Sequence, residues 1–521
     1  DSMSAGNATD NTAIGYDALT ANTTGDGNTG IGASALTANT TANDNTAIGF
    51  LALATNTTGA TNTALGRSAL TANTTASYNT AVGYAALAAN TTGADNVSVG
   101  YNSLDANTTG ASNTAVGTQA LTGNTTASHN TAVGKNSLKV NTTGAQNTAV
   151  GSNALDANTT GDKNVAVGYD ALGANTDGVR NTAVGYEALK TSTGSYNTGV
   201  GYLALTLNTT ATYNTSLGYN AGGELTTGGS NTAVGGLALD STSTGANNTA
   251  VGKSALSANT TASHNTAVGY NALLTNTTGA SNVAVGKDAL YSNTTGYQNV
   301  AIGYNALYAQ TNSYSNIGIG YLAGDAITTG IRNTCIGEDA GGTITTGGYN
   351  VAIGRRAMGV GAVTASHNIA IGTEALEDNT SGTENIAIGL VAMKSVTTGH
   401  NNIALGYSAL ATLTTGAYNV AIGPYALEDA NEAGALTGRN TAVGYAAGKN
   451  ITSGEYNTLV GYMAGGTGTT TGNGNTAVGY FALEDVTGSE NTVVGQEAGF
   501  NIAGGGQNTC IGIRAGDGIT G

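Results

Sequence analysis

Apolar and polar residues follow one another along this chain in a pattern that repeats every 17 residues. Each repeat begins with the five residues Asn-x-x-aliphatic-Gly, which occur thirty times between Asn11 and Asn508, almost always at this spacing. A period of this length is too short for a helical-hairpin repeat and is typical of one coil of a β-solenoid. We therefore predict an all-β fold, a parallel β-solenoid or β-roll of about thirty 17-residue coils. The array would occupy residues 11–521, with residues 1–10 as its N-terminal edge.

The coil NTAVGYNALLTNTTGAS, residues 265–281, shows what each position predicts. Its asparagine is position 1, and positions 2 and 4, here Thr266 and Val268, are β-branched or aliphatic in every coil. Alternate residues of a strand share one face, so we expect this pair to point into the core, with Leu273 at position 9 as a second core row. Position 5 is always glycine, here Gly269, which predicts a bend or a torsion that a Cβ would forbid.

Two asparagine positions predict ladders that run from coil to coil. Asn265 stands at position 1, which never varies, and Asn276 stands at position 12. Identical amides stacked about 4.8 Å apart can hydrogen-bond along the stack. We therefore interpret both asparagines as structural rather than as ligand-binding residues.

A correlated exchange indicates that positions 9 and 12 share one interior. Where position 9 is glycine, position 12 usually changes from asparagine to leucine or isoleucine, as in Gly324 with Ile327. An aliphatic side chain lost at one corner is regained three residues later, which conserves the core volume. Gly465 departs from this rule, because Gly468 stands at its position 12.

Position 3 carries small residues, and it lies on the opposite face of the strand from positions 2 and 4. It is usually alanine, as in Ala267, and Cys335 and Cys510 replace that alanine in two coils. A strand that is apolar on one face and small on the other is typical of burial on both sides. We therefore predict that these residues form an inter-chain contact; alternatively, the alanine column faces water.

The motifs NTAVG, NVAIG and NIAIG resemble the head repeats of YadA-like trimeric autotransporter adhesins. The longer unit NTAVGYxALxxNTTGxx also resembles repeat arrays of bacteriophage tail-fibre proteins. The resemblance spans nearly the whole chain, although its spacing is longer than the autotransporter repeat. It implies a left-handed homotrimeric β-roll and a fibrous, extracellular protein concerned with attachment.

Composition removes several classes of function. Charged residues make up 9% of the 521 residues, which is far below the usage of an ordinary enzyme domain. The net charge of −16 argues against nucleic acid and anionic membranes as partners. No apolar run has the roughly 18 residues of a membrane span.

The sequence offers no recognisable catalytic chemistry. Its four histidines lie many coils apart, and no phosphate-binding or nucleotide-binding motif is present. We expect no catalytic residue, no cofactor, no metal and no enzymatic activity.

Two features are candidates for outward contact with a host-surface glycan or protein receptor. Position 6 is often tyrosine, which is also simply a good strand former, and the coil that begins at Asn419 has four extra residues. Solenoid insertions form loops, often on a binding face, so we expect one within residues 424–439. The candidate contact residues are Tyr270, Tyr304, Tyr407, Pro424, Glu428 and Asp429.

The function expected from these observations is mechanical: the shaft of an extracellular attachment fibre, in particular a phage tail fibre. The alternatives are a bacterial surface adhesin or a self-assembling end-to-end filament. A further alternative is an ice-binding solenoid, for which the regular Asn-Thr-Thr triplets would supply the array. The location would be extracellular, on a virion tail or a cell surface, and the main partner would be the chain itself.

Overall fold

The structure is a computed structural model that describes residues 8–361, 363–430, 438–466, 468, 471–484, 487–500, 502 and 504–518. The chain divides into two compact units, Asp1–Ser263 and His264–Gly521, and each unit is described by itself. Within the described residues the chain contains strands and turns and no helix.

Each coil contributes one strand of three residues. In the first unit the strands are β1 (Thr12–Ile14), β2 (Thr29–Ile31), β3 (Thr46–Ile48), β4 (Thr63–Leu65), β5 (Thr80–Val82), β6 (Val97–Val99), β7 (Thr114–Val116), β8 (Thr131–Val133), β9 (Thr148–Val150), β10 (Val165–Val167), β11 (Thr182–Val184), β12 (Thr198–Val200), β13 (Thr215–Leu217), β14 (Thr232–Val234) and β15 (Thr249–Val251). In the second unit they are β16 (Thr266–Val268), β17 (Val283–Val285), β18 (Val300–Ile302), β19 (Ile317–Ile319), β20 (Thr334–Ile336), β21 (Val351–Ile353), β22 (Ile369–Ile371), β23 (Ile386–Ile388), β24 (Ile403–Leu405), β25 (Val420–Ile422), β26 (Thr441–Val443), β27 (Thr458–Val460), β28 (Thr476–Val478), β29 (Thr492–Val494) and β30 (Thr509–Ile511).

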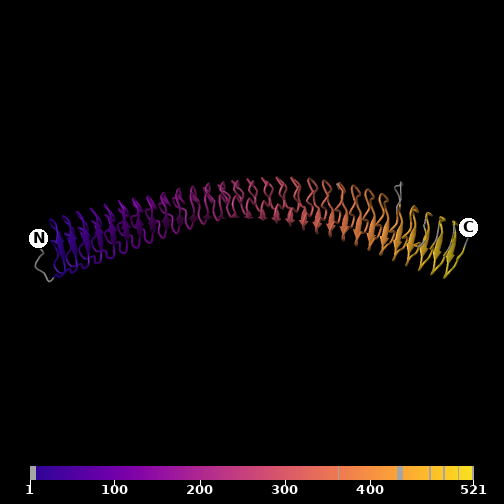
Figure 1. Cartoon of the computed structure of the whole chain (residues 1–521), viewed down its shortest axis with the longest axis horizontal. Coiled ribbons are helices and arrows are strands. Elements are labelled where there is room, and N and C mark those ends of the chain that lie inside the picture. Colours follow the sequence, from indigo (N-terminus) through magenta and orange to yellow (C-terminus); the bar gives the residue numbers. More distant parts are fainter. Residues whose placement is uncertain are drawn as a thin grey trace. The chain divides into compact units, whose positions relative to one another are not determined.

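Within each unit, every strand pairs in parallel with the strand of the next coil. The register joins equivalent positions, as where Thr266, Ala267 and Val268 of β16 face the corresponding residues of β17. The same register joins β1 to β2 in the first unit. In each unit the strands run along one side of the coils (Figure 1). The predicted parallel β-solenoid is confirmed, with about 29 turns of about 17 residues.

The core of each coil is built from positions 3, 8 and 9. Ala267, Ala272 and Leu273 are fully buried, which confirms the prediction for Leu273. The prediction for Thr266 and Val268 is wrong, because both side chains are half-buried on the outer face of the strand. The leucine of position 9 packs against position 3 of the next coil, as where a Cβ at Gly199 would lie 3.2 Å from Cγ of Leu189, which favours small residues at position 3.

The inter-chain contact predicted at position 3 is also wrong. Ala267 and Cys335 are fully buried and Cys510 is 5% exposed within a single chain, so all three face the chain's own core. Both cysteines are free thiols, and burial raises the pKa of the Cys335 thiol to about 12. They therefore serve as small core residues.

Gly269 is required by its backbone and by its neighbour, as predicted. Its φ of 137° is one that L side chains rarely adopt, and a Cβ there would lie 2.4 Å from the carbonyl oxygen of Gly286. Leu273 also has a positive φ, of 53°. That conformation is costly for β-branched residues, which explains why position 9 is restricted to leucine, methionine and glycine.

The exchange between positions 9 and 12 is confirmed as volume compensation. A Cβ at Gly324 would lie 3.0 Å from Cδ1 of Ile327, so the isoleucine occupies the space that a leucine at position 9 would fill. At Gly465 the space is filled from position 3 instead, because Leu459 is buried and its Cδ1 would lie 3.0 Å from a Cβ at Gly465. The apparent exception therefore follows the same requirement that the space beside a glycine at position 9 be filled.

Candidate functional site

The asparagines of position 1 brace the coils from inside, as predicted. Asn265 Nδ2 donates to the carbonyl oxygen of Gly279 in its own coil at 2.9 Å. Its Oδ1 accepts the backbone N–H of Asn282 in the next coil, also at 2.9 Å. One buried side chain thus closes its own coil and fixes the next one, which leaves no free amide for a ligand.

The asparagines of position 12 form the second ladder. Asn293 Nδ2 donates to Oδ1 of Asn276 at 2.8 Å, and Asn276 Nδ2 donates to the same Gly279 carbonyl oxygen at 2.9 Å. Asn276 is fully buried, so the asparagine of the Asn-Thr-Thr triplet is internal. The triplet therefore does not present its three side chains on one outer surface.

The outer face of the strands is a regular surface in each unit. Positions 2 and 4 project from it in register, and position 4 exposes aliphatic side chains such as Ile388 (39%) and Ile422 (38%). In the first unit position 2 is threonine in all coils but those of Val97 and Val165. Between residues 283 and 422 of the second unit, position 2 is valine or isoleucine except at Thr334, so the face there is almost wholly aliphatic.

The tyrosines of position 6 point outward, as predicted. Tyr270, Tyr304 and Tyr407 are 46%, 40% and 43% exposed. Where successive coils carry tyrosine the rings stack, as Tyr304 does on Tyr321 at a centroid distance of 5.4 Å. Stacking covers the ring faces on which a sugar would pack and leaves edges and hydroxyls exposed.

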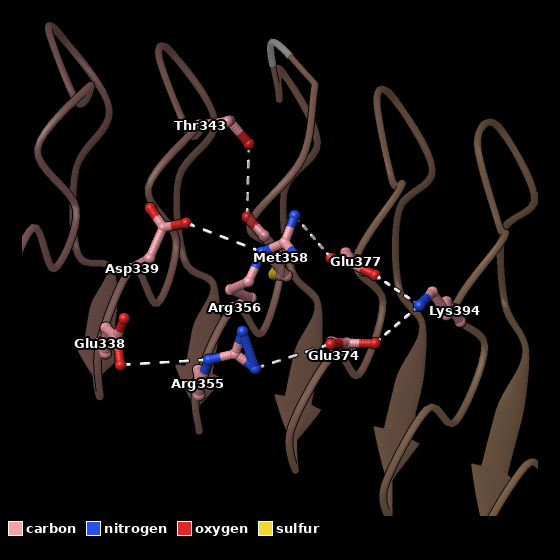
Figure 2. A network of polar contacts seen from close by, with 9 residues as sticks. All are labelled: Glu338, Asp339, Thr343, Arg355, Arg356, Met358, Glu374, Glu377 and Lys394. Atoms are coloured by element: carbon pink, nitrogen blue, oxygen red, sulfur yellow. Dashed lines mark hydrogen bonds and ion pairs between the residues drawn. The ribbon is translucent and has the colours of Figure 1, made fainter.

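Four neighbouring coils of the second unit share a network of ion pairs (Figure 2). Arg356 Nη2 lies 3.0 Å from Oε1 of Glu377, whose other carboxylate oxygen lies 3.1 Å from Nζ of Lys394. Lys394 also lies 2.6 Å from Oε2 of Glu374, and this contact lowers the pKa of the Glu374 carboxyl. The remaining members of the network are Glu338, Asp339 and Arg355.

This network spans the coil that begins at Asn350, which has one residue more than the usual number. Glu377 is only 4% exposed, so its charge depends on the two cations beside it. No direct signal in the sequence marks the network, because positions 6, 7 and 10 of successive coils come together only in the folded coil. We interpret it as a clamp on an irregular coil.

One member of the network, Asp339, also forms an acidic pair with Asp325. Burial, and then the charge of Asp339, raise the pKa of the Asp325 carboxyl to about 6. Asp339 itself is drawn toward Arg356, at 3.9 Å. Among the described residues, no third side chain joins these two carboxylates in a group that could hold a metal ion.

The predicted insertion is only partly visible, since residues 431–437 of the range 424–439 lie outside the described residues. Pro424 is exposed at position 6, while Glu428 and Asp429 are half-buried. Glu428 Oε2 lies 2.9 Å from Nζ of Lys449, so this carboxylate already has a partner in the next coil.

The described residues contain no group of three or more His, Cys, Asp or Glu side chains placed to hold a metal ion. Over the same residues, no helix is long and apolar enough to cross a bilayer. No model of a known protein family matches the chain, and no curated protein matches it either.

Proposed function

We propose that the chain is the shaft of an extracellular attachment fibre, most simply a phage tail fibre. The observation that supports the proposal is the in-register stacking of coils whose buried polar groups hydrogen-bond to one another. Each coil adds a rise of about 4.8 Å, and its role in this proposal is to extend and stabilise the solenoid. The resemblance to autotransporter head repeats and tail-fibre arrays supports the same role, outside a cell or on a virion.

The proposal includes self-association, as a left-handed homotrimer, through the outer face of the strands. Positions 2 and 4 expose aliphatic side chains in long rows, and exposed apolar surface of this extent is typical of a protein interface. The face proposed for the interface is therefore the outer face that carries Val268, and not the buried face that carries Ala267. Enzymatic activity and a cofactor have no place in this proposal.

Light scattering of the purified chain, with native mass spectrometry, tests this proposal. A trimer would have three times the chain mass of 50.9 kDa. A monomer at micromolar concentration would contradict the association. A distribution without an upper limit would favour the end-to-end filament or a surface adhesin that polymerises.

Ice binding remains a second candidate, on a different surface from the Asn-Thr-Thr triplets. In the first unit the outer face alternates threonine and an aliphatic residue, as in Thr46 and Ile48 of β3, in rows fixed by the parallel register. Such an array offers hydroxyl and methyl groups at regular spacing to ordered water. Thermal hysteresis of the purified chain tests it, and a reading of zero would remove this candidate.

A further inference from the structure

An open pocket of about 560 Å³ lies among three successive coils near residues 480–517. This volume is within the usual range of small-ligand sites, about 300–1,000 Å³. Its lining departs from the rest of the chain, because every lining residue is aromatic or charged although the chain has 9% charged and 5% aromatic residues. Two of the three phenylalanines of the whole protein, Phe481 and Phe500, meet here.

The pocket begins where a tyrosine stack ends. Tyr480 stacks on Tyr462 at a centroid distance of 5.3 Å, but the next coil has Gln496 at position 6, so no further tyrosine continues the stack. The ring of Phe481 stands at 72° to that of Tyr480, with their centroids 4.5 Å apart. The two rings form a corner, and Phe500 supplies an aromatic wall from the next coil.

The charges around these rings are mostly negative. The lining contains three carboxylates, from Glu484, Glu497 and Asp517, against the single guanidinium of Arg514. Arg514 Nε lies 2.6 Å from Oε2 of Glu497, and this contact lowers the pKa of the Glu497 carboxyl. The lining as a whole therefore has two more carboxylates than cations and carries a net negative charge.

An aromatic corner beside carboxylates favours a cation over a sugar. Sugar hydroxyls need donors as well as acceptors, and the donors of this lining are the Tyr480 hydroxyl and a guanidinium that Glu497 already binds. An alkylammonium group has no acceptor on its nitrogen, and its positive charge is attracted to carboxylates and to ring faces. The same protein places Lys449 over Tyr425 at 5.1 Å and Lys287 over Tyr304 at 5.2 Å.

We propose that this pocket binds an alkylammonium group, seated against Tyr480, Phe481 and Phe500 and facing the carboxylates of Glu484 and Asp517. The site is independent of the proposed shaft function, because it is formed by side chains of three coils in one chain. A lysine side chain of a partner protein and a free polyamine would share this chemistry.

Saturation-transfer NMR on the full chain tests the proposal, with choline as the probe and 3,3-dimethylbutan-1-ol as its neutral isostere. We expect choline to bind saturably and the neutral isostere to bind at least tenfold more weakly. Phe500→Ala should weaken choline binding about tenfold, while Tyr308→Ala, which removes an aromatic ring from the same position of a distant coil, should leave it unchanged. Glu484→Gln removes a negative charge, keeps the shape of the pocket and should also weaken choline binding. It therefore tests the proposal even if Phe500→Ala disturbs the coil.

Equal binding of choline and its neutral isostere would overturn the proposal, as would choline binding that neither pocket variant changes. Competition then identifies the source of the cation. Displacement of choline by N-acetyl-lysine methylamide indicates a protein side chain, and displacement by spermidine indicates a free polyamine. Failure of both competitors would overturn the proposal as well.

Discussion

At the scale of the residue, the backbone at position 5 determines how tightly the coils can stack. Gly235 has a φ of 128°, and a Cβ there would lie 2.6 Å from the carbonyl oxygen of Gly252. The next residue, Gly236, is also a glycine, but a Cβ there would have a single neighbour, at 3.9 Å. The structure therefore requires glycine at position 235, whereas position 236 has room for a larger residue.

We predict that Gly235→Ala destabilises its coil by more than about 3 kcal/mol, because it combines a disfavoured torsion with a backbone clash. Gly236→Ala is the matched control and should change stability by less than about 0.5 kcal/mol. Thermal unfolding, with limited proteolysis to locate the opened coil, measures both. Equal behaviour of the two variants would contradict this account of position 5.

The residues of the strand also explain why the sequence predicts the wrong face of the strand as the one that points into the core. Alternation in the strand shows that Thr266 and Val268 share one face and that Ala267 lies on the other, but both faces are apolar or small. What decides between them is volume, because Leu273 already fills most of the narrow interior. The invariant glycine and the asparagine ladders depend on one position each, and those could be predicted.

At the scale of the element, positions 9 and 12 of one coil fill a shared space in the core. Leucine at position 9 with asparagine at position 12 is one solution, and glycine with isoleucine is another, as in Gly324 with Ile327. If Asn276 is replaced, Asn293 in the next coil keeps a hydrogen bond of its own, from Nδ2 to the carbonyl oxygen of Gly296 at 3.0 Å. The two solutions should therefore be interchangeable as pairs.

We predict that Leu273→Gly alone costs about 2–5 kcal/mol, because it leaves a cavity in the coil. Adding Asn276→Ile should recover at least about half of that loss, whereas Asn276→Ile alone should destabilise because it removes the hydrogen bonds of Asn276 with Gly279 and Asn293. A double-mutant cycle on local unfolding, followed by amide exchange of residues 265–298, gives the coupling. Additive losses would show that positions 9 and 12 do not share a space.

Charges near the irregular coil predict a pH dependence of opposite sign for two carboxylates. The pKa of the Asp325 carboxyl is raised to about 6 in the folded chain. Protonation of this carboxyl therefore stabilises the folded chain at low pH, and this stabilisation is lost as the pH rises through about 6. Asp325→Asn should thus raise stability above pH 6, on the order of 1 kcal/mol after solvent screening. Because the pKa of Glu374 is lowered by Lys394, its contribution is present at neutral pH and lost in acid.

Unfolding midpoints measured from pH 3 to pH 8 on the full chain test these signs. Glu374→Gln serves as the opposite control, since it should lower stability at neutral pH and flatten the acid limb. A gain from Asp325→Asn that is the same at pH 4 and pH 8 would exclude titration as its cause. None of these pairings follows from the repeat pattern, because they depend on which coils carry charges at positions 7 and 10.

At the scale of the whole molecule, the repeat gives each unit one continuous outer face, and its composition decides what the face can bind. A row of threonines next to aliphatic residues is amphipathic in the first unit, while residues 283–422 of the second unit are nearly all aliphatic. Removal of the second kind of surface from water is worth about 25 cal/mol per Å². We therefore expect association between copies to depend mainly on residues 283–422.

The double variant Ile388→Lys and Ile422→Lys places two charges on that face, at side chains that are already 39% and 38% exposed. Such positions tolerate lysine in the single chain, but burying an unpaired ammonium in an interface costs several kcal/mol, so the assembly should dissociate to the chain mass of 50.9 kDa. The control, Ser381→Lys with Thr398→Lys, adds the same charge at exposed turn positions and should keep the assembled mass. If both double variants dissociate, net charge rather than this face governs assembly; if neither does, the interface lies elsewhere on the coil.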